Sequence, residues 1–400
     1  MSRLTVLWRQ YAAVLGTPSA RRFTVAAFVG RLPTTMFALV LTALLRSFGW
    51  NYAEIGAVIA ASALCTAVAS PVLGRLADSR GQRPVALASV SVYTVGLLTI
   101  VLIGSALPYV AVLVIAAASG AANPPLAVLV RGRWSNHLVR RENLTRAFAW
   151  ETALEGVGWV IGPLLGSGLI SFLGPRPTVA CALLFTVAGT IWFALLDSAP
   201  RGRGAGPTSR GRLPLPSREV RHRILSFVAI GGMLGSVDLG LVAYGLAWNR
   251  NLAGVFLTAF AVGGAVGSLT AGAATSHVST VRRLRLAGLC TVVSMIALIL
   301  ASTPLTVAGA ATLGGASLTP FMSLTYAALG EAVSEQLVSE AVGWAAGGVG
   351  LGISGGTVVA GWILDGNARS AVFGFAAALG VLVLVLGYLS TRRQRAELGS

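Results

Sequence analysis

The chain has 400 residues, of which 55% are hydrophobic and only 11% are charged. With a mean hydropathy of +0.78, this composition excludes an ordinary water-soluble domain, in which about a quarter of the residues carry charge. The formal net charge of +17 is typical of proteins that bind nucleic acids, so its meaning depends on where the basic residues lie.

Long apolar segments recur along the chain. The hydrocarbon core of a bilayer is about 30 Å thick and requires roughly 20 apolar residues in each crossing helix. Twelve such segments run over residues 23–45, 54–73, 85–105, 108–130, 147–173, 178–197, 224–247, 251–274, 286–302, 304–328, 340–364 and 369–390. The sequence therefore predicts an all-α polytopic membrane protein with twelve transmembrane helices.

All thirty basic residues are arginine, and most fall on one side of the predicted membrane. With the N-terminus inside, twenty-five lie in the two tails and the inner loops, while the outer side has Arg46, Arg176, Arg250 and Arg369. Such a bias is the positive-inside rule of membrane proteins. It predicts that both termini are cytoplasmic, and it accounts for the charge without nucleic acid as a partner.

Residue types that hold metals or carry out catalysis are scattered. The histidines and cysteines stand far apart in the chain, at His137, His222, His277, Cys65, Cys181 and Cys290. No metal-ligand spacing, phosphate-binding loop or pairing of a nucleophile with a base stands out. No cleavable signal peptide precedes the first span. We therefore expect no enzyme, no metal and no cofactor.

An internal repeat divides the chain. "TRAFAWETALEGVGWVIG" at 145–162 aligns without gaps with "SEAVGWAAGGVGLGISGG" at 339–356, so that Trp150 falls on Trp344. Residues 198–223 are rich in Gly, Pro, Ser and Arg, which is typical of a flexible linker. We predict a six-helix N-terminal half over 1–197, a cytoplasmic linker over 198–223 and a six-helix C-terminal half over 224–400.

The turn between the second and third predicted spans, "GRLADSRGQRPV" at 74–85, carries a family pattern. It resembles the signature G-x-L-a-D-r-x-G-r-k of the major facilitator superfamily (MFS), with matches at Gly74, Leu76, Asp78, Gly81 and Arg83. Ser79 and Gln82 stand where the family usually has basic residues, and Arg80 or Arg75 could substitute for them. The twelve spans, the two repeats and the central linker match the same family over essentially the whole chain.

This resemblance implies two pseudo-symmetric six-helix bundles that transport a solute by alternating access. It also implies that Asp78 caps the start of the eleventh helix, in the other half, because a carboxylate suits the positive end of a helix. Ser276 occupies the corresponding position of the second half. The charged turn is therefore expected to act as a gate on one half only.

The fifth predicted span contains "GWVIGPLLGS" at 158–167. It is similar to the antiporter motif G-x-x-x-G-P-x-x-G-G of the same superfamily, with matches at Gly158, Gly162, Pro163 and Gly166 and with Ser167 at the last position. Small residues and a proline favour a close, bendable contact between the halves, although ordinary packing would use the same residues. Ala116 replaces an arginine that proton-coupled exporters of the family carry in the fourth span.

Charged side chains inside a span are costly unless they are paired or hydrated, so each is a candidate for function. Arg31 in the first span and Glu155 in the fifth lie at matching depth, and we expect them to pair. Such a pair could also be purely structural. Glu151 lies one turn closer to the membrane surface, where we expect it to be solvated.

Two further polar residues lie within spans. Asp238 has no basic partner in its own half, and is a candidate for a proton carrier or for a contact to a cationic cargo. Asn123 precedes Pro124 and Pro125. It could bind cargo, although we expect it to hydrogen-bond a carbonyl that the prolines leave free.

These observations predict a monomeric, multi-pass transporter of the bacterial cell membrane, with a small molecule, protons and the lipid bilayer as partners. The favoured function is proton-coupled export of a drug-like or lipophilic compound. One alternative is an importer of a sugar, an organic acid or another metabolite. Another is a membrane receptor or assembly subunit that keeps a transporter fold without transporting.

Overall fold

The computed structural model describes residues 18–137, 141–196, 218–248, 250–273, 280–331, 338–366 and 369–397. All regular structure within these residues is helical. The first group of helices is α2 (Pro18–Arg31), η1 (Leu32–Met36), α3 (Phe37–Ser47), α4 (Tyr52–Arg80), α5 (Gln82–Ile103), η2 (Gly104–Ala106), α6 (Tyr109–Ala121), α7 (Leu126–His137), α8 (Arg141–Leu173) and α9 (Pro175–Leu195). The second group is α10 (Arg218–Trp248), α11 (Arg250–Ala273), α12 (Thr280–Leu300), α13 (Pro304–Glu331), α14 (Val338–Asp365) and α15 (Ala371–Glu397).

Eleven helical stretches in the described part of the chain are long and apolar enough to cross a membrane, and Ala371–Gly387 forms a shorter twelfth. Each of the twelve predicted spans is found in this set. Of the linker predicted over 198–223, residues 198–217 lie outside the described residues, and α10 already begins at Arg218. Ser276 also lies outside the described residues.

Two of the predicted spans are interrupted. The first span passes from α2 to α3 through the 3₁₀ helix η1, which contains Pro33. The fourth breaks between α6 and α7, at Asn123, Pro124 and Pro125. A proline removes one backbone N–H and clashes with the carbonyl four residues earlier, and two in succession end the helix. Breaks at membrane depth are tolerated where they are buried in protein or line a cavity.

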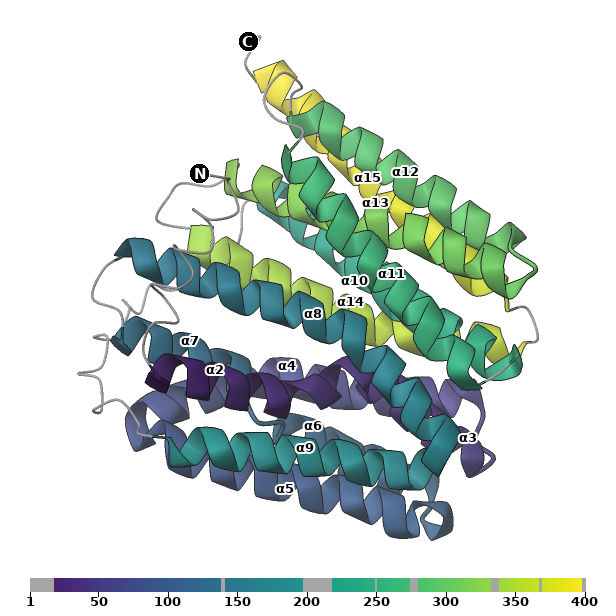
Figure 1. The fold of residues 1–400 in the computed structure, drawn as a ribbon. Coiled ribbons are helices and arrows are strands. Elements are labelled where there is room, and N and C mark those ends of the chain that lie inside the picture. Colours follow the sequence, from purple (N-terminus) through teal and green to yellow (C-terminus); the bar gives the residue numbers. More distant parts are fainter. Residues whose placement is uncertain are drawn as a thin grey trace, which may run out of the picture.

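The two groups of helices converge at one end of the molecule and diverge at the other (Figure 1). We call the diverging end the terminus face, because α2 begins there at Pro18 and α15 ends there at Glu397. The opposite end, where α4 begins at Tyr52 and α14 ends at Asp365, is the far face.

Among the described residues, the apolar clusters that connect the two groups lie at the far face. The largest cluster of the first group takes in Val242 and Ala253 of the second group. Tyr52 of the first group packs against a cluster formed by α10, α14 and α15. Nearer the terminus face, the cluster around Phe23 and Trp134 contains residues of the first group alone, and the cluster around Phe227, Leu329 and Ala345 contains residues of the second group alone.

Glycines set the closest helix contacts at the far face. A side chain at Gly361 of α14 would collide with the backbone of Tyr52, and one at Gly56 of α4 would collide with the carbonyl of Thr357. Towards the terminus face, positions Gly343 and Gly347 of α14 have no neighbour within 4 Å among the described residues. In this part of the chain, the cleft between the groups is therefore open at the terminus face and closed at the far face.

Close packing inside the first group depends on Gly189 of α9, whose missing Cβ would meet the backbone of Gly30 in α2. We expect Gly189→Ala to lower the free energy of unfolding by about 1–3 kcal/mol, because overpacking forces the two backbones apart. Thermal unfolding of the purified protein in detergent measures this. Gly168→Ala is the matched control, because that helical glycine has no neighbour within 4 Å; an equal loss in both variants would contradict the packing argument.

Candidate functional site

A cavity of about 190 Å³ lies beside the breaks of the first and fourth spans. Helices α2, α4, α7 and α8, together with η1, contribute its walls. Its lining is mixed: Arg31, Thr34, Thr35, Thr66, Ser70, Asn123 and Glu155 are polar, and Phe28, Leu32, Pro124, Pro125, Leu126, Ala127, Val128, Leu154, Gly158 and Trp159 are apolar. A few polar groups on a mostly apolar wall are typical of sites for small molecules.

Thr66 of α4 repairs the break in the fourth span. Its hydroxyl donates a hydrogen bond of 2.8 Å to the carbonyl of Gly120. In a continuous helix the N–H of residue 124 would donate to this carbonyl, but Pro124 has no N–H. The backbone N–H of Asn123 donates to the same carbonyl at 3.1 Å, so Asn123 takes the expected part with its backbone and not with its side chain. The Asn123 side chain lines the cavity, and within the described part of the chain it makes no hydrogen bond.

Arg31 pairs with Glu151, not with Glu155. The distance from Arg31 Nη2 to Glu151 Oε2 is 2.5 Å, and only 2% of the Glu151 side chain is exposed. The other carboxylate oxygen of Glu151 accepts a hydrogen bond of 3.1 Å from Trp134 Nε1. Both expectations were therefore wrong, the pairing of Arg31 with Glu155 and the solvation of Glu151. Matching depth along two helices does not decide which face of α8 is turned towards α2, and the structure buries the Glu151 face.

Glu155 lies in the cavity wall with 48% of its side chain exposed. Its nearest basic partner is Arg131 of α7, at 4.0 Å and about equally exposed. Because Glu151 already neutralises Arg31, Glu155 is the charged group of the lining whose described ion pair is long and exposed. Trp159, one turn further along α8, lines the same cavity.

Asp238 lies in α10 and does not line this cavity. Within the described part of the chain, its side chain makes no hydrogen bond or ion pair. It lies one turn before Val242, which packs in the apolar cluster of the first group. Leu234 and Leu241, also one turn away, pack in the apolar cluster of the second group, so Asp238 lies between residues that pack against the two groups.

The turn between α4 and α5 has the geometry that its glycine predicts. Gly81 adopts a positive φ of 98°, which disfavours other residues. Asp78, Arg75 and Arg80 are exposed. The contact expected between Asp78 and the start of the eleventh helix concerns a region that includes residues 332–337, which lie outside the described residues.

Gln82 binds a buried arginine. Its Oε1 accepts a hydrogen bond of 3.0 Å from Arg133 Nε, and its Nε2 donates one of 3.2 Å to the carbonyl of Leu129. Arg133 is 1% exposed and also donates to the carbonyl of Phe193. The substitution of Arg75 or Arg80 for the family's basic residues stays a prediction, while Gln82 itself is bonded to a basic group from α7.

The glycines of the motif in α8 pack within the first group. Gly162 and Gly158 face Thr35 of η1, and Gly166 faces Met36. The expected contact between the two groups is present, but other residues of the segment make it. Gly254 of α11 lies against the carbonyl of Pro163 and the side chain of Ser167, and the Thr258 hydroxyl donates a 2.9 Å hydrogen bond to the carbonyl of Val160.

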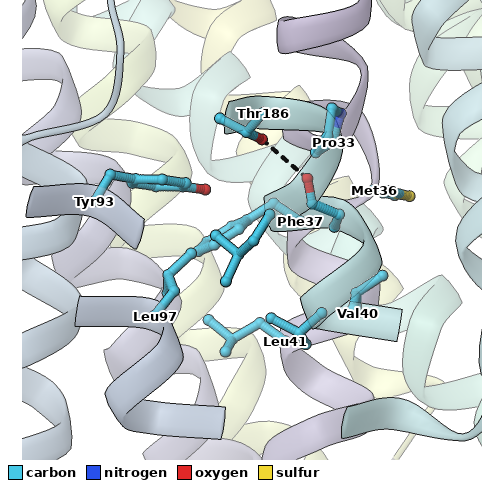
Figure 2. Close-up of a pocket in the computed structure, with 11 residues that line it drawn as sticks. Pro33, Met36, Phe37, Val40, Leu41, Tyr93, Leu97 and Thr186 are labelled. Atoms are coloured by element: carbon cyan, nitrogen blue, oxygen red, sulfur yellow. Dashed lines mark hydrogen bonds between the residues drawn. The ribbon is translucent and has the colours of Figure 1, made fainter. Parts of the chain in front are cut away.

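A second, smaller pocket lies on the other side of the first span. It has a volume of about 20 Å³, which is room for about one water molecule. Figure 2 shows Tyr93 and Leu97 of α5 facing Phe37, Val40 and Leu41 of α3 around it. It is too small and too apolar to hold a solute.

Helix α4 receives a cap from the other group of helices. The two carboxylate oxygens of Asp365, at the end of α14, accept hydrogen bonds of 2.7 Å from the backbone N–H groups of Tyr52 and Ala53. Sequence reasoning missed Asp365 because it lies just beyond the end of a predicted span. It also missed the structural roles of Arg133 and Trp134, which lie beyond the predicted end of the fourth span and are buried in the structure.

The geometry defines a class of protein. Two groups of membrane-length helices, with broken helices beside a cavity that has polar groups in its wall and a cleft that is open at one end, form the architecture of a membrane transporter. The chain belongs to the Major Facilitator Superfamily, whose model matches residues 23–244 and 223–399. It is a multi-pass membrane transporter, and the predicted all-α fold of this family is confirmed.

Solved structures share the fold at low sequence identity. A mutant form of the nucleoside transporter NupG is 12% identical with a TM-score of 0.77, over 93% of this chain and 98% of that one. A bacterial homologue of the iron transporter ferroportin, in an inward-facing state, is 16% identical with a TM-score of 0.66, over 92% and 98%.

A bacterial homologue of the human lysosomal transporter Spinster, in an inward-facing and occupied conformation, is 14% identical with a TM-score of 0.68, over 93% and 96%. At these identities the likeness concerns the fold alone. A comparison with curated protein sequences finds no match.

The two glutamates of α8 should differ in their contribution to stability. We expect Glu151→Gln to lower the free energy of unfolding by about 3 kcal/mol, because it leaves the half-buried Arg31 without a counter-charge. Glu155→Gln should change it by less than about 1 kcal/mol, because that pair is long and exposed. Denaturant unfolding of the two variants in detergent compares them, and a larger loss for Glu155→Gln would contradict the assigned pairing.

Proposed function

We propose that this chain is a secondary active exporter in a bacterial cell membrane, coupled to protons, whose cargo is an amphipathic organic cation. The observation that carries the proposal is the cavity beside η1 and the α6–α7 break, with Glu155 and Trp159 in its wall. The family supplies the general mechanism of alternating access between two halves. Halves over 1–197 and 224–400, joined by 198–223, remain the proposed division.

The arginine bias supports a cytoplasmic terminus face, since most of the arginines lie in the segments predicted to be inside. In that orientation the cleft opens to the cytoplasm. A cargo leaving the cell would enter the cavity in this state. Closure of the terminus face and opening of the far face would then release it outside.

The charge balance of the cavity favours a positively charged cargo. Arg31 is neutralised by Glu151, while Glu155 has only the distant, half-exposed Arg131. Trp159 offers an aromatic face one turn away, and cations bind the faces of aromatic rings. Asn123 offers a further carbonyl oxygen that is free of other hydrogen bonds within the described residues.

Asp238 supports the proposed proton coupling. It is a carboxylate within the span of α10, between residues that pack against the first group and residues that pack against the second, and no described residue pairs with it. A group in that position changes its surroundings when the two groups move relative to one another. Protonation from outside and release to the cytoplasm would then drive the return step.

Asp78 is proposed as the gate at the terminus face. In this state its side chain is exposed. When the terminus face closes, the start of α14 would approach it, and its negative charge would stabilise the positive end of that helix. The outward-facing state would thus be stabilised by a contact that the cytoplasm-open state lacks.

Proton coupling is tested in proteoliposomes loaded with tetraphenylphosphonium, under an imposed pH gradient and a clamped membrane potential. We expect Asp238→Asn to abolish the dependence of efflux on the gradient while exchange of labelled for unlabelled cargo continues, because exchange needs no net proton transfer. Asp238→Glu, which keeps a carboxyl group, should retain coupling. Gradient-driven efflux that is unchanged in Asp238→Asn would overturn the assignment, and gradient-driven uptake of a sugar or organic acid would favour an importer.

Cargo charge is tested by the affinity of the purified protein for tetraphenylphosphonium and for tetraphenylborate, which has the same shape and the opposite charge. We expect Glu155→Gln to weaken binding of the cation roughly tenfold, because a charged partner of this kind contributes about 1.5 kcal/mol. Arg131→Gln should strengthen it, since Arg131 competes for the same carboxylate. Tighter binding of tetraphenylborate than of tetraphenylphosphonium by the wild type would contradict a cationic cargo.

A further inference from the structure

We propose that Asp365 is a latch that holds the far face closed in the cytoplasm-open state and is released when the two groups of helices rock. The latch joins the end of α14 to the beginning of α4, and so joins the second group of helices to the first. It goes beyond the proposed function because it concerns the conformational equilibrium of the protein and not its cargo or its coupling ion.

All N–H groups at the start of α4 have hydrogen-bond acceptors, and these come both from α4 itself and from α14. The first N–H groups of a helix have no partner within the helix. Asn51 and Glu54 form a capping box, in which each side chain accepts from the backbone N–H of the other. The remaining N–H groups, those of Tyr52 and Ala53, donate to Asp365.

One set of bonds therefore stabilises α4 alone, and the other set stabilises the contact between the two groups of helices. The capping box belongs to α4 alone and stays intact however α14 moves. The bonds to Asp365 exist only while the end of α14 lies against α4. A carboxylate at a helix N-terminus also gains from the positive end of the helix dipole. Removing Asp365 therefore weakens the closed far face and leaves α4 with its own cap.

The surrounding packing places Asp365 at the point of closest approach. Gly361, one turn earlier on α14, lies directly against the backbone of Tyr52 and Ala53. Tyr52 also packs against the apolar cluster of the second group that contains Ala360 and Leu364. Because the carboxylate is at an exposed rim, water competes for its bonds, and the latch biases the equilibrium without locking it.

The two helices run in opposite directions, so residues later in α4 face residues earlier in α14. Gly361 meets Tyr52, Gly56 meets Thr357, and Gly350 meets Ala67. Continued to the other end of α4, this antiparallel order leads from the turn that carries Asp78 towards the beginning of α14. One pair of helices thus has a carboxylate near each end. Asp365 favours the state in which the far face is closed, and the gate proposed at Asp78 favours the opposite state.

The test measures distances between pairs of spin labels in full-length protein in lipid nanodiscs, with Cys65, Cys181 and Cys290 replaced by alanine. Val72→Cys with Val342→Cys reports on the terminus side, and Ala106→Cys with Ser302→Cys reports on the far side; all four positions are exposed. We expect Asp365→Ala to shift the population about tenfold towards a shorter terminus-side distance and a longer far-side distance. Asp365→Asn, which keeps one acceptor oxygen, should shift it less.

Asn51→Ala is the matched control, because it removes the local cap of α4 and leaves Asp365 in place. It should lower the melting temperature without a comparable shift in either distance distribution. Unchanged distances in Asp365→Ala would overturn the latch, whether or not the melting temperature falls. The measurement needs neither cargo nor a proton gradient, so its result is independent of the proposed export.

Discussion

The structure depends on the rule that no backbone polar group can be left without a partner inside a bilayer. Pro124 and Pro125 break the fourth span, and Thr66 of a neighbouring helix donates to the carbonyl of Gly120 beside the break. The break beside it in the first span is covered by the glycine face of α8. The cavity is lined by residues of both breaks, so the residues that interrupt the helices also create room for a solute.

Most charged groups inside the bundle likewise have partners within the protein. Arg31, Glu151 and Trp134 form a closed group in which the buried carboxylate accepts from both partners. Arg133 is held by Gln82 and by the carbonyl of Phe193. With these charges satisfied by the protein, Glu155 is the acidic group left in the cavity wall, and Asp238 in α10 has no described partner. Satisfied pairs stabilise the fold, whereas these two carboxylates are the ones proposed to bind cargo and protons.

Glycines mark the places where the two groups of helices come into close backbone contact. Helices in lipid gain little from burying apolar surface against each other, so close contact between backbones is what holds them. Such contacts between α4 and α14, and between α8 and α11, occur at the far face. At the terminus face the two groups have separate apolar cores. In the proposed alternating access, a hinge of this form would let the groups rock without unpacking either core, and the contacts proposed at Asp365 and Asp78 would bias the direction.

The sequence by itself determined the number and approximate position of the spans, because a run of about 20 apolar residues has few other stable environments. It also determined the family, since the turn at 74–85 and the repeat are patterns along the chain. Partners across helices were beyond its reach. Depth within the membrane can be counted from residue numbers, but the rotation of each helix about its axis is set by packing. Only the tertiary structure decided that Arg31 meets Glu151, that Gln82 meets Arg133, and that Asp365 reaches the first residues of α4 from the far end of the sequence.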